Sequence, residues 1–194
     1  MNEKLLASIR FYFAQSVFNT NCHFKAYNRL VKNKKRISNF VKFIAAGTLL
    51  LLILQIIGLE HHCQSLLNIL AFIGILFTGV SLIFEIFNKE DISPQIFQQK
   101  MYAEKYKSLR DEYMGLIEEI MSNSLSEELL RIKRDNLQKH YSAFGENAPQ
   151  TIKEDYKQTQ LGLGLEGSNG EEFTWSDKEI DKFLPDQLRL NKQN

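Results

Sequence analysis

Two long apolar runs separated by six residues constrain this chain more than any other feature. The first, Phe43 to Leu59, has 17 residues and the second, Leu66 to Phe84, has 19, and neither contains a charged residue or a proline. An α-helix, which rises ~1.5 Å per residue, needs ~20 residues to cross ~30 Å of hydrocarbon. Because every backbone group in lipid must be bonded inside its own segment, two adjacent spans with a tight turn predict an antiparallel transmembrane hairpin.

The alternative is a buried helical hairpin in the core of a soluble protein. Core helices of soluble proteins seldom stay uncharged for this many residues. We therefore predict an all-α membrane protein, in which a two-helix transmembrane hairpin is flanked by cytosolic amphipathic helices. The predicted segments are a basic helical segment (1–40), the hairpin (41–87, with spans at about 41–59 and 66–87), a cytosolic helical region (88–145) and a polar acidic tail (146–194).

The charges are distributed unevenly around these runs, although the formal net charge is only +1. Residues 1–40 carry eight Lys/Arg and one Glu, whereas residues 88–194 carry fifteen basic and twenty acidic side chains. The connector between the two runs contains neither Lys nor Arg. The positive-inside rule therefore predicts that both termini lie in the cytoplasm and that the turn lies outside.

The polar residues of the two runs are arranged in stripes. On the second helix they recur at steps of three or four, and on the first helix Gln55 shares a face with Ala45 and Thr48. The candidate residues are Gln55, Asn68, Gly74, Thr78, Ser81 and Glu85. One interpretation is that these residues only hold the two helices together. The other is that they line water in an oligomer, with a ring of Glu85 carboxylates selecting cations at the cytoplasmic mouth.

The segment before the first span is predicted to be amphipathic. Apolar residues from Leu6 to Val31 recur mostly at three- and four-residue steps, which places them on one face of a helix. Such a helix either lies along the lipid headgroups or packs against the helix that follows the second span.

A long helix is predicted to begin at Ser93-Pro94 and to carry a heptad pattern rich in tyrosine. The residues of this pattern are Tyr102, Tyr106, Leu109, Tyr113, Leu116 and Ile120. A lone helix cannot bury them, so they are a candidate oligomer seam or an intramolecular packing surface.

The remaining residues are predicted to contain two further helices. Ser126 or Ser124 is the expected N-cap of the first, and Ser176 with Glu179 forms a capping box for the second, which we expect to run through Phe183 and end at Pro185. The glycine-rich stretch from Gly162 to Gly167 is interpreted as a flexible linker. The acidic tail is expected to present an exposed peptide motif.

The sequence lacks the common catalytic motifs. It contains no phosphate-binding loop, no paired-histidine zinc helix and no nucleophile elbow. His61, His62 and Cys63 are consecutive in a short turn, where they are poorly placed to surround one metal ion. We therefore expect no enzyme activity, no metal and no cofactor. The basic run from Lys32 to Arg36 is explained by its place beside a span, so no nucleic-acid partner is expected.

The order of these elements resembles the SLATT family of bacterial two-transmembrane effector domains, which accompany nucleotide-signalling and other conflict systems. The resemblance is carried by His23 to Leu30 (HFKAYNRL) and Phe97 to Ile120 (FQQKMYAEKYKSLRDEYMGLIEEI), and it covers about residues 5–145. It implies a multi-pass protein of the bacterial inner membrane, an antiviral effector that forms homo-oligomers and permeabilises the lipid bilayer. It also implies activation by a cytosolic sensor or signalling partner encoded alongside. The alternative is a non-conducting anchor or adaptor that recruits a cytosolic partner through its C-terminal region.

Overall fold

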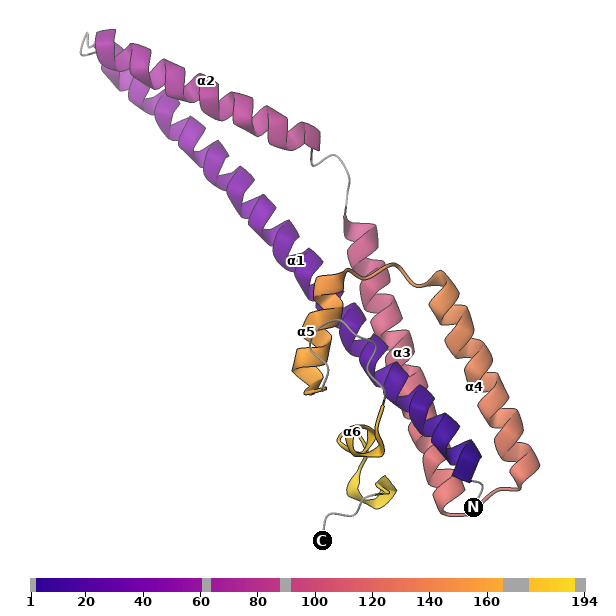
Figure 1. Cartoon of the computed structure of the whole chain (residues 1–194). Helices are drawn as coiled ribbons and strands as arrows, with labels where there is room; N and C mark the ends of the chain where they lie inside the picture. The colour runs from indigo at the N-terminus through magenta and orange to yellow at the C-terminus, as the bar shows by residue number, and fades with distance from the viewer. Residues whose placement is uncertain (1–2, 61–63, 88–91, 166–174, 191–194) are drawn as a thin grey trace. The chain divides into compact units, whose positions relative to one another are not determined.

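Helices form all the regular structure in the part of the chain that the structure describes. This is a computed structural model, and it describes residues 3–60, 64–87, 92–165 and 175–190. The helices are α1 (Glu3–Glu60), α2 (Gln64–Phe87), α3 (Ser93–Met121), α4 (Glu127–Asn147), α5 (Lys153–Leu163), α6 (Asp177–Asp181) and a 3₁₀ turn at Asp186–Leu188 (Figure 1). The predicted all-α class is confirmed.

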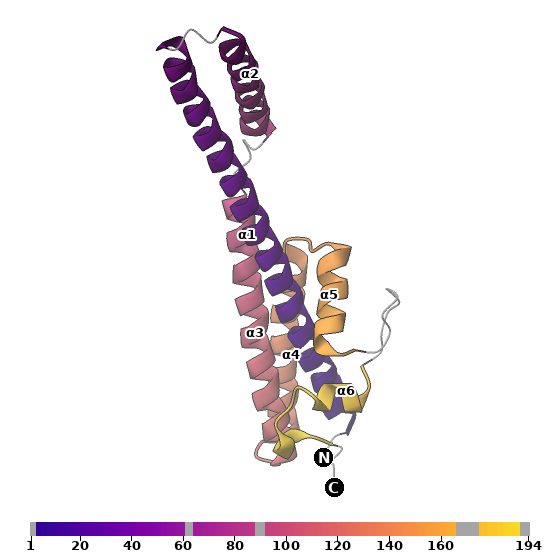
Figure 2. The same ribbon diagram turned by 90° about the vertical axis from the view of Figure 1, so that its left-hand side faces the viewer.

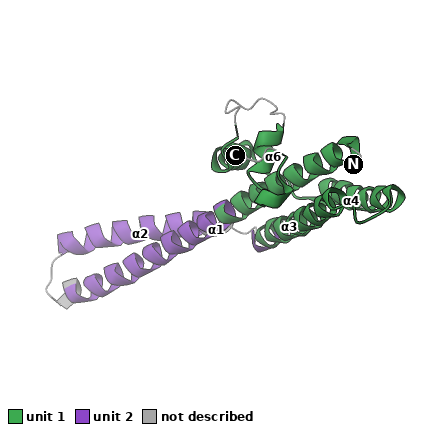
Figure 3. Cartoon of the chain, turned by 90° about the horizontal axis from the view of Figure 1, so that it is seen from below, with its two compact units in different colours: residues 1–28, 95–194 green, residues 29–94 purple. Residues whose placement is uncertain are grey.

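The chain divides into two compact units, which are coloured separately in Figure 3. Unit 1 combines Met1–Asn28 with Gln95–Asn194, and unit 2 comprises Arg29–Pro94. The long helix α1 contributes its first part to unit 1 and the rest to unit 2.

Unit 2 is the predicted helical hairpin. The second part of α1 and the whole of α2 each contain an 18-residue stretch that is apolar enough to cross a membrane, with mean hydropathies of 2.3 and 2.4. Leu70 is the only buried residue among the side chains of α2 that the structure describes, and side chains such as Phe43 and Ile75 are each 70% exposed. An apolar surface of this extent is not stable in water, so the interpretation as a soluble core hairpin is wrong for these helices. The hairpin has the composition and exposure of a membrane-spanning segment.

Unit 1 is built around the N-terminal part of α1. This part of the helix lies between α3 and α4 on one side and α5 and α6 on the other (Figures 1 and 2). Its apolar residues Leu6, Ile9, Phe13 and Val17 are buried in one cluster with residues of α3 and α4. Of the two arrangements left open for the N-terminal helix, the structure therefore shows packing against the helix after the second span.

The tyrosine-rich pattern of α3 is also used inside unit 1. All six of its residues are buried, with exposed fractions of 7% or less: Tyr102, Tyr106, Leu109, Tyr113, Leu116 and Ile120. Aromatic pairs join α3 to its neighbours, because Tyr12 stacks on Tyr113 at 6.0 Å and His23 stacks on Tyr106 at 5.5 Å. The intramolecular alternative is what the structure shows, so these side chains are not on the surface of the folded unit.

Helix ends follow the predicted capping chemistry. The hydroxyl of Ser126 accepts a hydrogen bond from the backbone N–H of Leu129 at the start of α4, so Ser126 rather than Ser124 is the N-cap. The capping box of Ser176 and Glu179 begins α6 as predicted. This helix ends at Asp181, two residues before the predicted end at Phe183.

The expectation of an exposed C-terminal motif is wrong. Ile180 and Leu184 are 4% and 2% exposed and belong to the core cluster of unit 1. Helix α5 was not predicted from the sequence, and it includes part of the stretch interpreted as a flexible glycine-rich linker. Gly162 lies in α5, and Gly164 is its left-handed C-cap with φ of 61°, a conformation that glycine adopts without steric cost. Gly167 lies outside the described residues.

Candidate functional site

A groove runs along one side of the hairpin, between the second part of α1 and α2. Its volume is about 500 Å³. The lining residues are Thr48, Leu51, Leu52 and Gln55 of α1 and Ala71, Gly74, Ile75, Thr78, Gly79 and Leu82 of α2. The groove is therefore mostly apolar, with a few polar groups contributed by both helices.

The two helices contact each other beside this groove. The ring of Phe77 lies over Gly47, where a Cβ atom would come within 2.9 Å of Phe77 Cε2. Nearer the N-terminal end of the span, the rings of Phe40 and Phe84 are 4.8 Å apart. In both pairs the residue numbers add to 124, as residues at the same depth of an antiparallel helix pair do. Glycine at position 47 thus permits the contact that closes the hairpin.

The structure brings together part of the predicted polar stripe. Gln55, Gly74 and Thr78 line the groove, on its two walls. Asn68 is exposed and Ser81 is half-buried, and neither belongs to the lining. The side chain of Glu85 lies outside the described residues, as do His61, His62 and Cys63 of the turn. Only part of each stripe therefore faces the shared groove, while Gly47 and aromatic rings make the close contact.

The polar groups of the groove are chemically different from one another. The hydroxyl of Thr48 donates to the backbone carbonyl of Ile44 at 2.9 Å, and that of Thr78 donates to the carbonyl of Gly74 at 2.9 Å. These bonds satisfy the hydroxyl protons within each helix, which lowers the cost of placing threonine in an apolar medium. Gln55 brings a carboxamide with both donors and acceptors into the lining. The groove offers weakly polar surface to water or to another helix.

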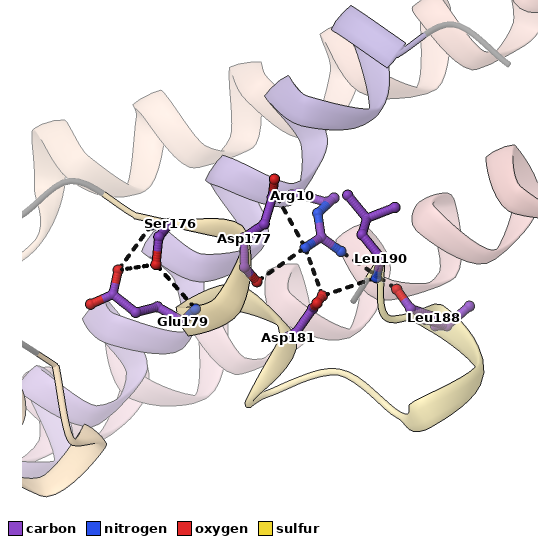
Figure 4. A network of polar contacts seen from close by, with 7 residues as sticks. All are labelled: Arg10, Ser176, Asp177, Glu179, Asp181, Leu188 and Leu190. Carbon is purple, nitrogen blue, oxygen red and sulfur yellow. Dashed lines mark hydrogen bonds and ion pairs between the residues drawn. The ribbon is translucent and has the colours of Figure 1, made fainter. Parts of the chain in front are cut away.

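A second polar cluster lies in unit 1 and was not predicted. Arg10 of α1 is fully buried, and its Nη2 atom is 2.7 Å from Asp181 Oδ1 and 3.3 Å from Asp177 Oδ1 (Figure 4). Its guanidinium also donates to the backbone carbonyls of Asp177 and Leu188. The backbone N–H of Leu190 donates to the same Asp181 oxygen. Arg10 thus attaches residues 177–190 to the first helix.

One sequence signal pointed to this cluster. Arg10 interrupts an otherwise apolar helical stretch from Leu5 to Phe13, apart from small Ala7 and Ser8. A charge in such a place requires a buried partner of opposite sign. The sequence does not indicate which carboxylate supplies it, because the partner is 171 residues away along the chain.

Two further buried polar groups of unit 1 connect α1 to the helices around it. His23 Nδ1 lies 2.7 Å from Gln99 Oε1, and the amide of Gln99 donates to the carbonyl of Gln150. Burial lowers the pKa of His23, and the bond to Gln99 opposes this shift. Burial raises the pKa of the Cys22 thiol, which is free and lies 3.5 Å from the hydroxyl of Thr151. These contacts are structural, and the described residues contain no cluster of metal-ligating side chains.

Comparison with known proteins identifies a family that this chain matches. A family model described as "SMODS and SLOG-associating 2TM effector domain family 4" matches residues 5–179. The match extends past residue 145 and takes in α5 and the first part of α6. No curated protein and no solved structure matches the chain.

Proposed function

The chain belongs to family 4 of the SMODS and SLOG-associating two-transmembrane effector domains, and from this premise we propose that it is a pore-forming membrane effector. In this proposal it acts in a bacterial anti-phage or other conflict system. Its hairpins assemble in the inner membrane, with both termini in the cytoplasm, and let ions cross when a partner protein triggers them. The observation that carries the proposal is the groove along the hairpin.

The groove supports assembly because a single hairpin leaves its lining uncovered. Gln55 and the backbone at Gly74 and Gly79 would face lipid in an isolated hairpin, where a carboxamide finds no hydrogen-bond partner. A neighbouring subunit that packs into the groove provides protein surface, and small residues allow its helix to approach closely. A ring of subunits with this face inward provides water instead.

The ring arrangement would make the polar face a conducting path. Thr78 lies within the apolar length of α2, whereas Glu85 follows near its end. In the proposed ring, the carboxylates of Glu85 would concentrate cations at the cytoplasmic mouth. Thr78 would contribute to the narrower part, where apolar bulk stops conduction by excluding water.

The family description supports a trigger from outside this chain. It names the domain as associating with SMODS and SLOG, which are outside the two-transmembrane effector domain itself. We propose that unit 1 receives the signal, since it is the folded part of the chain outside the spans.

The test is ion release from liposomes that contain the purified full chain at increasing protein-to-lipid ratios. Wild type should release potassium, Thr78→Leu should release little, and Glu85→Gln should conduct with a weaker preference for cations over anions. Val80→Leu is the matched control. This substitution also enlarges a side chain of α2 two residues away, but Val80 does not line the groove. High protein-to-lipid ratios drive the hairpins to assemble by mass action without the partner. Absence of release at every ratio from a folded, inserted protein would therefore favour the non-conducting anchor. Equal release from wild type and Thr78→Leu would remove this face from the pore.

A further inference from the structure

A dense basic stripe precedes the first apolar run, outside both the groove and the core of unit 1. The segment from Arg29 to Lys42 contains six Lys/Arg and neither Asp nor Glu. Lys32, Lys35, Arg36 and Lys42 are exposed to solvent along α1.

The basic side chains are grouped on one side of the helix. At about 100° per residue, Arg29, Lys32, Lys35, Arg36 and Lys42 fall within an arc of about 140°. These five residues are called the basic stripe below. Lys34 falls outside this arc and donates to the hydroxyl of Ser93. The grouping is therefore a property of the stripe and not of every lysine in the segment.

Most of the basic stripe is turned away from the other helix of the hairpin. The side of α1 that meets α2 is marked by Phe40, whose ring lies 4.8 Å from that of Phe84, and by Ile44, which is 4% exposed. At about 100° per residue, these two positions lie about 20° and about 60° past Arg29, which is at one edge of the arc. The three lysines of the stripe therefore face the surroundings of the hairpin, whereas its two arginines lie nearer the side that meets α2.

The depth of the stripe fits the lipid headgroups. Lys42 directly precedes Phe43, the first residue of the apolar run. With a rise of ~1.5 Å per residue, Arg36 lies about 10 Å before that boundary and Arg29 about 21 Å before it. A headgroup layer is about 5–8 Å thick, and charges are screened over about 8 Å at physiological salt. Lys35, Arg36 and Lys42 therefore lie within reach of headgroup phosphates, whereas Arg29 is near the limit.

We propose that the basic stripe binds anionic phospholipid headgroups and gives the hairpin a preference for anionic lipid on this side of the bilayer. Phosphate is the shared chemistry of lipid headgroups and nucleic acids, but only lipid phosphate must lie next to Lys42 when Phe43 enters the hydrocarbon. Each basic side chain near an anionic surface contributes about 1 kcal/mol, which corresponds to at most about fivefold in lipid preference per charge. The preference does not depend on ion conduction, so the proposed pore and this binding surface can fail separately.

The test uses the full chain in phosphatidylcholine bilayers that contain traces of spin-labelled phosphatidylglycerol or spin-labelled phosphatidylcholine. The measured quantity is the fraction of each labelled lipid that the protein immobilises. Wild type should immobilise phosphatidylglycerol several-fold more than phosphatidylcholine, and 1 M salt should reduce this ratio. The combined Lys35→Gln, Arg36→Gln and Lys42→Gln variant should bring the ratio close to one. The matched control replaces Lys153, Lys157 and Lys178, which are exposed in unit 1, and should keep the wild-type ratio.

Two single variants at different distances from the apolar boundary test the proposal independently of the triple variant. Arg36→Gln should lower the ratio clearly, whereas Arg29→Gln should lower it little, because Arg29 lies more than one screening length farther from the apolar boundary. Equal immobilisation of the two lipids by wild type, or equal effects of the two single variants, would overturn the proposal. Binding of a labelled RNA or DNA duplex is measured in parallel, to test nucleic-acid phosphate as the alternative ligand. If it binds at 0.15 M salt and only the triple variant loses it, with lipid preference unchanged, the stripe belongs to a nucleic-acid site instead.

Discussion

At the scale of single residues, Arg10 determines how the C-terminal segment is attached. Its guanidinium and the carboxylate of Asp181 are 1% and 7% exposed, so both charges depend on each other for compensation. Removing one partner from a buried pair leaves the other charge without compensation, which costs about 3–5 kcal/mol, whereas replacing both with apolar residues is often tolerated. This buried salt bridge therefore holds two distant parts of the sequence together in a specific arrangement.

The first prediction concerns the salt bridge between Arg10 and Asp181. Arg10→Met should detach residues 175–190 from α1, because Asp181 would remain buried as an unpaired carboxylate. Trp175 is the only tryptophan in the chain and packs edge-on against Phe183 at 6.3 Å, so its emission should shift to longer wavelength. The double variant Arg10→Met with Asp181→Leu should recover most of the wild-type emission. An unshifted spectrum in Arg10→Met would contradict the role assigned to the pair.

His23 provides the second prediction, which concerns pH. Burial lowers its pKa below the ordinary value of 6.5, while Gln99 and, more weakly, Asp155 favour the charged form. Between the folded and the unfolded pKa the unfolded chain binds more protons, so the free energy of unfolding falls as the pH drops below about 6.5. Thermal unfolding of unit 1, followed by circular dichroism, should show this decrease in wild type. His23→Gln removes the titrating group and should flatten the pH dependence in this range.

At the scale of elements, the hairpin was predictable because its signal is local. The length and uninterrupted apolarity of the two runs predict spans, and the shared depth of paired positions follows from antiparallel geometry. Which face makes the contact was less predictable. Small and polar residues suggested that the stripes would meet, but Gly47 with Phe77 and Phe40 with Phe84 form the contact instead. Aromatic rings over a glycine fill space as well as two small residues do, and composition does not separate the two arrangements.

The third prediction tests this contact. In Gly47→Leu the new side chain would collide with Phe77, because even a Cβ atom would lie 2.9 Å from its ring, and the two helices should separate. A short bifunctional thiol reagent should join cysteines at positions 40 and 84 efficiently in the otherwise wild-type hairpin and poorly in Gly47→Leu. Gly79→Leu is the control, since nothing lies within 4 Å of a Cβ atom there. Equal cross-linking in all three proteins would show that Gly47 does not control the spacing.

At the scale of the whole molecule, the C-terminal region packs against the first turns of α1. Residues of the C-terminal region, among them Asp181 and Leu184, share the core of unit 1 with the first turns of α1. This packing could not be predicted from the sequence. The C-terminal segment is polar and has no regular spacing of apolar residues, and its hydrogen bonds to Arg10 join residues more than 160 positions apart. The tyrosine pattern of α3 was visible in the sequence, but its partner was not. A heptad pattern specifies a buried face without specifying which helix covers it.

The last prediction concerns the orientation of the whole chain in the membrane. The basic residues before the first span, and their absence from the connector, predict that the turn lies outside and both termini inside. An impermeant maleimide applied to spheroplasts should therefore label native Cys63. It should spare cysteines introduced at the exposed positions Lys4 and Lys157, each in a Cys63→Ser background. Cys22 is buried and should contribute little to the signal.

Detergent-permeabilised spheroplasts provide the control for this experiment, because all three sites should react once the membrane is open. Labelling of positions 4 and 157 before permeabilisation would reverse the orientation and place unit 1 outside the cell. A cytosolic partner would then have no access to it, and the proposed trigger would fail together with the topology. Labelling of only one of the two positions would exclude an even number of spans, because α1 and α2 would no longer form one membrane hairpin.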